Sequence, residues 1–219
     1  WLGLSWEEPV RRQSEHFADY RAALTRLEER GVVYPCFCSR KDIALAGGAP
    51  HDSDEGALYP GRCRALPAAE AAARIAEGRP YATRLNVAKA LALTGPLTWH
   101  DRAAGPQHAS PDRLGDVVLA RRDTPTSYHL SVTVDDALQG ITLVTRGTDL
   151  FAATHIHRLL QALLNLPAPD YHHHPLLTGD TGARLSKRDG ALALSALRAA
   201  GHTPAAVRAA AGFGDKDLT

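Results

Sequence analysis

The segment 116–164 constrains the fold more than any other part of this sequence. It contains two short, unbroken apolar runs at 117–120 and 141–144. Runs of this kind are typical of strands that are buried on both faces, as in parallel sheets. A helix is expected between the runs, at 128–138, and a clear amphipathic helix follows at 152–164. This order of strand, helix, strand and helix is the repeating unit of a doubly wound sheet, so the sequence predicts an α/β fold.

The remaining elements are predicted from periodicity and from signals at their ends. Residues 14–30 carry a helical stripe of apolar side chains, with Ser14 placed to cap the first turn and Gly31 just beyond the end. Residues 128–138 contain β-branched valines that favour a strand, but parallel strands require a crossover there, so we expect a helix. The other expected elements are a helix at 67–78, a strand at 81–87, a short hairpin within 95–111, and two short helices after a loop at 185–187.

Three cysteines lie in a segment that is too rich in turn-forming residues to bury a core of its own. They are Cys36 and Cys38, separated by one residue, and Cys63. Zinc favours sulfur-rich tetrahedral sites and can replace hydrophobic burial in stabilising a small segment. For the fourth ligand, chemistry alone prefers His51 to Tyr59, because imidazole is the commoner ligand. The alternative is three unrelated reduced cysteines.

Arg146 and Tyr128 each follow one of the two predicted strands. Residues at the carboxyl ends of parallel strands share one edge of the sheet, which is where ligands bind in such folds. An arginine fork matches a carboxylate, and a tyrosine hydroxyl adds one directional hydrogen bond, so the pair suits an acidic substrate. The alternatives are a surface ion pair for Arg146 and a half-buried core position for Tyr128.

A glycine-flanked loop carries Arg184, Lys187 and Arg188. Such a loop can close over a polyphosphate, although basic loops are more often simply solvated. The run His172-His173-His174 is interpreted as structural, because adjacent residues on an extended segment point to opposite faces and cannot converge on one metal. Asp135 and Asp136 are likewise interpreted as helix-terminal charges.

Composition narrows the class of protein. The 219 residues include 25 basic and 24 acidic ones, giving a net charge of +1. This balance argues against a general phosphate-neutralising surface, while a local basic face stays open. The sequence has no apolar run long enough for a membrane helix and no signal peptide pattern, so we expect a cytoplasmic protein without a membrane partner. The chain has no Met and opens on an apolar cluster at Trp1, which indicates N-terminal truncation.

Several motifs follow one another along nearly the whole chain. They are Leu2-Gly3-Leu4 with Arg12-Gln13-Ser14, Tyr34-Pro35-Cys36-Phe37-Cys38, Val134-Asp135-Asp136, Gly140-Ile141-Thr142 with Arg146-Gly147, and the lysine loop Arg184-Leu185-Ser186-Lys187-Arg188. In this order they resemble the motifs of the glutamyl-tRNA synthetase family of class I synthetases. The shorter glutamyl-Q type is implied by Tyr59-x-x-x-Cys63, by the residues 148–151 after Arg146, and by the few residues that follow the lysine loop.

The resemblance implies a class I synthetase Rossmann-like (HUP) nucleotide fold whose N-terminal part is missing. That part holds the class I histidine signature, so this polypeptide alone is expected to be impaired in catalysis. The implied segments are 1–34, a remnant of the first half of the nucleotide fold; 35–66, a zinc-binding insertion; 67–114, a connecting insertion; 115–168, the second half; and 169–219, the lysine loop with a short helical region that contacts the tRNA stem.

The same resemblance implies an enzyme that activates L-glutamate with ATP and Mg²⁺ to glutamyl-adenylate. It then transfers the glutamate to the queuosine base of tRNA(Asp), acting as a monomer. The implied site residues are Tyr128 and Arg146 for glutamate, Lys187 as the catalytic residue with Ser186 at the ATP phosphates, and Cys36, Cys38, Tyr59 and Cys63 for a structural zinc, a set that displaces His51.

Two alternatives stay open at this point. The first is a fragment of a discriminating or non-discriminating glutamyl-tRNA synthetase that charges tRNA(Glu). The second is a non-catalytic paralogue that keeps the zinc segment and the basic loop only to bind tRNA. The presence of Tyr128, Arg146 and Lys187 together favours an enzyme.

Overall fold

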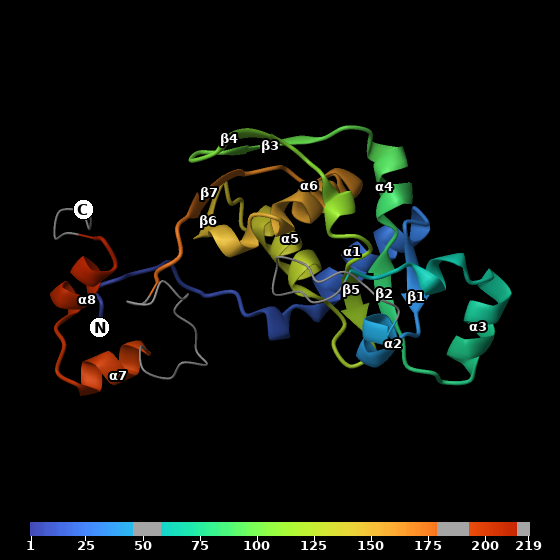
Figure 1. Cartoon of the computed structure of the whole chain (residues 1–219), viewed down its shortest axis with the longest axis horizontal. Helices are drawn as coiled ribbons and strands as arrows, with labels where there is room; N and C mark the ends of the chain where they lie inside the picture. Colours follow the sequence, from blue (N-terminus) through green and yellow to red (C-terminus); the bar gives the residue numbers. More distant parts are fainter. Residues whose placement is uncertain (46–57, 179–192, 214–219) are drawn as a thin grey trace. The chain divides into compact units, whose positions relative to one another are not determined.

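The computed structural model describes residues 1–45, 58–178 and 193–213 (Figure 1). The chain divides into two compact units, Arg12–His174 and a smaller one made of Trp1–Arg11 with Pro175–Thr219. Within the described ranges, no helix is both long enough and apolar enough to cross a bilayer.

The first sheet of the Arg12–His174 unit has three antiparallel strands in the order β1-β2-β5. The strands are β1 (Val33–Cys36), β2 (Ala82–Leu85) and β5 (Val118–Arg121). The apolar run at 117–120 is therefore a strand, as predicted, but the prediction that it runs parallel in a doubly wound sheet is wrong. An unbroken apolar run indicates that both faces are covered, and it carries no information on the direction of the neighbouring strand.

The second sheet has four strands in the order β4-β3-β7-β6. The predicted hairpin is present as β3 (Thr98–Asp101) and β4 (Gly105–His108), and it extends along the top of the unit in Figure 1. β7 (Asp170–His174) runs parallel to both β3 and β6 (Leu143–Gly147). The second apolar run is thus a parallel strand, as predicted, although it begins at Leu143. β7 was not predicted, because its sequence lacks an apolar alternation.

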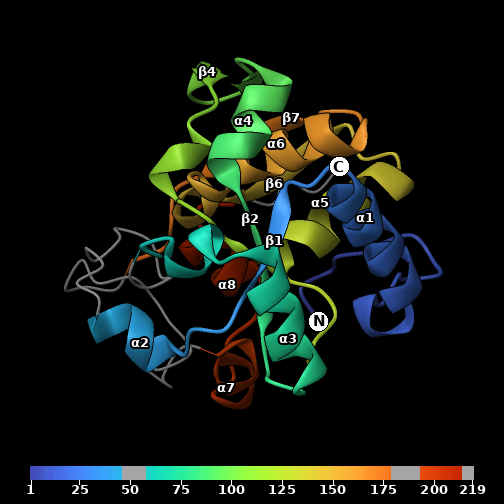
Figure 2. The same ribbon diagram turned by 90° about the vertical axis from the view of Figure 1, so that its right-hand side faces the viewer.

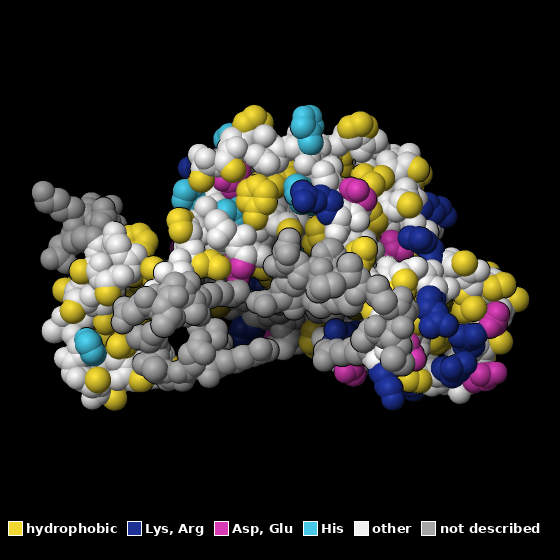
Figure 3. All heavy atoms as spheres, in the orientation of Figure 1, with side chains coloured by type: hydrophobic (Ala, Val, Ile, Leu, Met, Phe, Trp, Pro, Cys, Tyr) yellow, Lys and Arg dark blue, Asp and Glu magenta, His cyan; other side chains and the backbone are white. Residues whose placement is uncertain are grey.

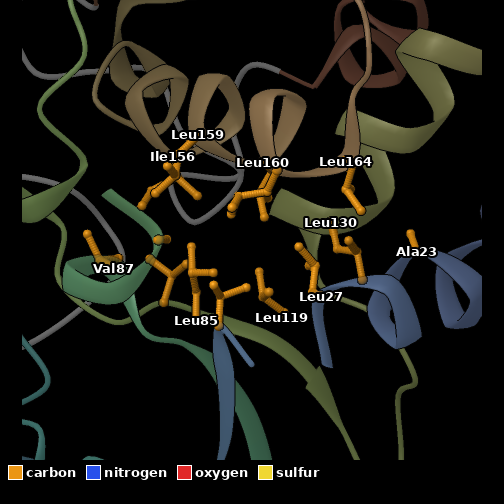
Figure 4. Close-up of a cluster of buried hydrophobic side chains, with 14 of the residues drawn as sticks. Ala23, Leu27, Leu85, Val87, Leu119, Leu130, Ile156, Leu159, Leu160 and Leu164 are labelled. Carbon is orange, nitrogen blue, oxygen red and sulfur yellow. The ribbon is translucent and has the colours of Figure 1, made fainter. Parts of the chain in front are cut away.

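Four helices pack over one hydrophobic core, and they are α1 (Phe17–Glu29), α4 (Val87–Thr94), α5 (Tyr128–Leu138) and α6 (Ala153–Leu164). The helix predictions at 128–138 and 152–164 are confirmed. Figure 4 shows Leu159 and Leu160 of α6 above side chains from the other helices and the first sheet. Burial of one such leucine contributes roughly 1.5–3 kcal/mol. The core residues labelled in Figure 4 are Ala23, Leu27, Leu85, Val87, Leu119, Leu130, Ile156, Leu159, Leu160 and Leu164.

The start of α1 differs from the prediction, and its end agrees. Ser14 lies in a 3-10 turn, Gln13–Glu15, and the cap position is taken by His16 without a side-chain hydrogen bond. The expected Ser14 cap is therefore wrong, because the helix starts two residues later than the capping signal indicated. Gly31 follows the helix with a φ of 63°, a left-handed conformation that glycine adopts without steric cost.

The predicted helix at 67–78 and strand at 81–87 are confirmed as α3 (Ala68–Ala76) and β2. α3 lies at the right-hand end of the unit in Figure 1 and below β1 and β2 in Figure 2. The remaining elements of this unit are α2 (Arg40–Leu45) and the 3-10 turns Arg62–Ala65, Pro111–Arg113 and Thr148–Leu150.

The smaller unit contains the two short helices predicted near the C-terminus, α7 (Leu194–Ala199) and α8 (Pro204–Ala210). α8 has a strong start signal, since the Thr203 side chain accepts the Ala206 backbone N–H and Pro204 occupies the first turn. Arg208 Nη1 donates to the Leu2 carbonyl over 2.9 Å. The N-terminal residues and α8 therefore pack together within this unit.

Asp135 and Asp136 lie in the last turn of α5 and have opposite environments. Asp135 is buried and accepts hydrogen bonds from Tyr20 Oη at 2.8 Å and Gln13 Nε2 at 3.0 Å. Burial raises the pKa of Asp136 to about 6, with Arg146 acting against the shift and Asp135 adding to it. The same helix end thus holds one satisfied carboxylate and one that burial destabilises when it is ionised.

The Asp136→Asn substitution is expected to stabilise the protein at pH 8 and to give no gain at pH 4. Because the folded-state pKa is raised, wild-type stability is fully present below the unfolded pKa and is lost as pH rises through about 6. Since the group is partly solvated, we expect a gain of about 1 kcal/mol in the free energy of unfolding. Denaturant unfolding at both pH values measures it. Asp135→Asn is the matched control and should destabilise, and parallel pH curves for Asp136→Asn and wild type would reject the prediction.

Candidate functional site

Arg146 and Tyr128, the two residues predicted to hold a carboxylate, come together in the structure. Arg146 lies in β6, and Tyr128 is the first residue of α5, whose start is capped by the Ser127 side chain. Arg146 Nη1 donates to Tyr128 Oη over 3.1 Å. Tyr128 is 44% exposed and Arg146 is half-buried, so a ligand can reach the pair. The expected common sheet edge is wrong, because β5 and β6 belong to different sheets.

Three further side chains, none of which the sequence singled out for this role, hold the Arg146 guanidinium. Its Nε donates to His173 Nε2 at 3.1 Å, its Nη1 to His157 Nδ1 at 3.1 Å and its Nη2 to Thr154 Oγ1 at 2.5 Å. All three partners are at least 96% buried. Thr154 and His157 lie three residues apart in the amphipathic helix α6, a spacing that places them on one face and could have revealed these two.

His173 sits in the middle of the triple histidine run. Along β7 the side chains alternate in burial, so His173 is buried while His174 is exposed. The run is therefore an alternating strand segment, the geometry on which its structural interpretation rests. Burial lowers the pKa of His173; the Asp101 hydrogen bond acts against this, and Arg146 adds to the lowering. Burial likewise lowers the pKa of His157 well below its usual value, with His129, Arg146 and His173 adding.

Asp101, at the end of β3, lies directly behind His173. Its Oδ2 is 2.6 Å from His173 Nδ1, and its Oδ1 accepts the backbone N–H groups of Ala103 and Ala104. Burial alone would raise the pKa of Asp101, but the hydrogen bonds from His173 and from these backbone groups outweigh it, and the pKa is lowered. Asp101 is thus an ionised carboxylate, fully buried, that ties the hairpin to the site.

Aromatic rings enclose the buried side of this cluster. The ring centres of Trp99 and Phe151 are 5.0 Å apart, and those of Phe151 and His173 are 4.9 Å apart. The Arg146 guanidinium carbon lies 5.3 Å from the centre of the Tyr171 ring. Such surroundings lower the local dielectric constant and strengthen each hydrogen bond within the cluster.

The three cysteines converge, as predicted. The sulfur atoms of Cys36, Cys38 and Cys63 all lie within 4.8 Å of one another, and Cys38 Sγ is 3.6 Å from Cys63 Sγ. A tetrahedral zinc with Zn–S bonds of about 2.3 Å places its sulfurs about 3.8 Å apart. The cysteine geometry therefore fits a zinc ion. Cys36 ends β1, and Cys63 lies in the 3-10 turn Arg62–Ala65.

Tyr59 lies beside the sulfur cluster. Its Oη is 3.9 Å from Cys38 Sγ and accepts the Cys63 backbone N–H at 2.7 Å. Without a metal, burial and the Cys36 thiol raise the pKa of Tyr59, and burial raises the pKa of Cys38 to about 11. A bound cation lowers the pKa of its ligands, so it would oppose these shifts.

A buried carboxylate joins the cysteine segment to the first sheet. Asp116 accepts hydrogen bonds from Tyr34 Oη at 2.6 Å, from Arg64 Nη1 at 3.1 Å and from the Val87 backbone N–H at 3.0 Å. These donors come from β1, from the 3-10 turn that carries Cys63 and from α4. Asp116 therefore links the turn that carries Cys63 to β1 and α4.

Three predicted residues lie outside the described ranges. They are Lys187 and Ser186 of the lysine loop and His51, the fourth zinc ligand preferred on chemical grounds.

A local basic face is present despite the near-neutral total charge. A pocket of about 350 Å³ is lined by Arg21, Arg79, Arg121 and Arg122, with Glu28 as the acidic residue among its described lining. Figure 3 also shows Lys and Arg side chains gathered over the end of the unit that carries α3 in Figure 1. A polyanion would be attracted to such surfaces.

Comparison with known proteins identifies the family of the chain. The sequence profile of "tRNA synthetases class I (E and Q), catalytic domain" matches residues 1–213. The chain is 48% identical to the glutamyl-Q tRNA(Asp) synthetase of Rhodobacter capsulatus, over 95% of this chain and 77% of that protein. It is 43% identical to the glutamyl-Q tRNA(Asp) synthetase of Symbiobacterium thermophilum, over 94% of this chain and 65% of that protein.

A solved structure carries the same fold. The glutamate-tRNA synthetase from Elizabethkingia anophelis superposes with a TM-score of 0.68 at 25% identity, covering 87% of this chain and 41% of that one. The chain therefore belongs to the class I tRNA synthetases of the glutamate and glutamine type and, within them, to the glutamyl-Q tRNA(Asp) synthetases.

Proposed function

We propose that the protein activates L-glutamate with ATP, as its Mg²⁺ complex, and transfers the glutamyl group to queuosine in tRNA(Asp). The observation that carries this proposal is the contact between Arg146 and Tyr128, in a chain 48% identical to a glutamyl-Q tRNA(Asp) synthetase. A half-buried arginine charge beside an exposed phenol is suited to a carboxylate ligand.

Arg146 and Tyr128 are proposed to bind a carboxylate of glutamate. Arg146 supplies the charge, and Tyr128 Oη, which now accepts from Arg146, turns its own hydrogen toward the ligand. Water is kept from the buried side by Trp99, Phe151 and Tyr171, which strengthens these hydrogen bonds. Lys187 and Ser186 are proposed to contact the ATP phosphates, where a lysine stabilises negative charge that develops in the transition state.

Cys36, Cys38, Cys63 and Tyr59 are proposed to hold a structural zinc. The sulfur spacing supports three of these ligands, and the position of Tyr59 Oη, 3.9 Å from Cys38 Sγ, supports the fourth. Four protein ligands leave no open coordination position for a water, so the ion would stabilise the segment and take no part in the reaction.

The tRNA partner is proposed from the relatives' names together with the basic surfaces. The pocket with four arginines and the Lys and Arg side chains over the α3 end provide positive charge for a phosphate backbone. A second candidate function is charging of tRNA(Glu), and the superposition with a glutamate-tRNA synthetase favours it. The two functions share glutamate activation and differ in the acceptor.

Glutamate-dependent exchange between ATP and pyrophosphate, measured in the full-length protein without tRNA, tests the proposal. Exchange without tRNA is expected for the glutamyl-Q type, whereas the ordinary family members are expected to need their tRNA. Glutamine and aspartate serve as control amino acids. A complete lack of exchange, with and without tRNA, would contradict glutamate activation and favour a non-catalytic tRNA-binding protein.

A further inference from the structure

We propose that His173 and Asp101 are positioning residues for the substrate carboxylate: they fix the Arg146 guanidinium through a one-way chain of hydrogen bonds that requires a neutral imidazole. This inference rests on the proposed function and deepens it. The chain runs from Asp101 at the end of β3, through His173 in β7, to Arg146 in β6. Three neighbouring strands of one sheet therefore set the direction of one side chain.

The direction of the chain follows from the donors that each group carries. An arginine has only donors, so His173 Nε2 must accept from Arg146 Nε at 3.1 Å. His173 therefore carries its hydrogen on Nδ1, which donates to Asp101 Oδ2 at 2.6 Å. The same argument applied to Arg146 Nη1 makes His157 Nδ1 an acceptor and places the hydrogen of His157 on Nε2, facing His129 Nδ1 at 3.1 Å.

Asp101 is itself held rigidly. Its Oδ1 accepts the backbone N–H of Ala103 at 2.9 Å and that of Ala104 at 2.8 Å. Its Oδ2 also accepts the backbone N–H of His173 at 3.2 Å. The side chain has no measurable exposure. A buried, charged acceptor with this many donors fixes the rotamer and tautomer of the histidine that it contacts.

The charge of Arg146 is left available to a ligand. Its four side-chain partners, His173, His157, Thr154 and Tyr128, are all uncharged in this arrangement. Among the residues that the structure describes, no carboxylate oxygen lies within ion-pair distance of the Arg146 guanidinium. An oriented guanidinium without a direct counter-ion favours an anionic ligand over a neutral amide of the same shape, which suits glutamate over glutamine.

The arrangement predicts a dependence of glutamate affinity on pH. Protonation of His173 removes its acceptor and places an imidazolium beside Arg146, so the affinity should fall as pH decreases through the lowered pKa of His173. Other titratable groups lie around this cluster. They are Asp101 on β3, Tyr171 on β7, Tyr128, His129 and Asp136 on α5, and His157 on α6.

Two substitutions at His173 separate positioning from general structure. His173→Asn keeps a donor for Asp101 but is too short to accept from Arg146, whereas His173→Gln places its amide oxygen near the former Nε2 and does not titrate. We expect His173→Asn to raise the KM for glutamate by roughly 10- to 100-fold, with a smaller change in kcat. In His173→Gln we expect a KM for glutamate close to that of wild type. Because glutamine does not titrate, this variant should not show the decrease in affinity at low pH that His173 causes. The control His172→Asn, on the same strand, should match wild type.

The measurement is amino-acid-dependent exchange between ATP and pyrophosphate in the full-length protein, with KM values for glutamate and ATP and a melting curve for each variant. An unchanged glutamate KM in His173→Asn, or equal impairment of both variants with matched folding, would overturn the inference. The nitrogen chemical shifts of ¹⁵N-labelled histidine provide a test that does not depend on the substrate. A hydrogen on Nδ1 of His173 supports the chain, and a hydrogen on Nε2 contradicts it. If wild type shows no exchange with glutamate, the proposed function fails while this NMR result still decides the positioning role.

Discussion

Glutamate binding is expected to weaken by roughly 10²- to 10³-fold in the Arg146→Ala variant, about 3–4 kcal/mol in binding free energy. The substitution removes the positive charge that is proposed to bind the carboxylate. It also removes the donor that links Tyr128, Thr154, His157 and His173. Isothermal titration calorimetry with glutamate measures the loss directly.

Arg146→Lys separates charge from geometry in the same experiment. A lysine keeps the positive charge but cannot reproduce the planar fork, so we expect most of the affinity to be lost here as well. Arg74→Ala is a suitable control, because Arg74 pairs with Glu70 on α3 and has no contact with the Arg146 cluster. Wild-type affinity in Arg146→Ala would show that the carboxylate binds elsewhere.

Loss of a zinc ligand is expected to have the largest effect on folding. In Cys38→Ser we expect the bound zinc to be lost and the free energy of unfolding to fall by on the order of 5 kcal/mol. The reason is that the segment around Cys36, Cys38 and Cys63 has a small hydrophobic cluster, consisting of these residues with a few neighbours. Metal analysis together with denaturant unfolding measures both effects.

Tyr59→Phe is the matched variant for the zinc prediction. It keeps the ring, over which the Arg84 guanidinium carbon lies at 4.0 Å, and removes only the oxygen. We expect zinc affinity to weaken without complete loss, whereas dialysis against a strong chelator should reproduce the Cys38→Ser effect in wild type. Unchanged zinc content and unfolding in Cys38→Ser would show that the cysteines are simply reduced thiols.

The sequence predicted the elements better than their pairing. Helices at 128–138 and 152–164 and the hairpin within 95–111 are present, because periodicity and turn residues report on local structure. The direction of β5 was predicted wrongly, and β7 was not predicted as a paired strand, although residues 172–174 were treated as extended. Pairing depends on which distant segment covers an edge, and the two buried side chains of β7, Tyr171 and His173, have partners on β3, β6 and α6.

Only part of the site was predicted from the sequence. The convergence of Cys36, Cys38 and Cys63 and the meeting of Arg146 with Tyr128 were inferred from spacing, family resemblance and strand ends. Asp101 was not, because it meets His173 across 72 positions of the sequence. Thr154 and His157 were not, because the side of α6 that faces Arg146 is set by tertiary packing. The roles of Lys187 and Ser186, the zinc ligand set and the five-segment division of the chain stay predictions.

Acylation of purified tRNAs tests the central claim most directly. The full-length protein would be supplied with ATP, Mg²⁺ and radiolabelled glutamate, and with tRNA(Asp) containing queuosine, tRNA(Asp) lacking it, or tRNA(Glu). We predict label on the queuosine-containing tRNA(Asp) alone, and retention of that label after removal of the 3′-terminal nucleotides. Label on tRNA(Glu) at its 3′ end would contradict this account and identify the second candidate function.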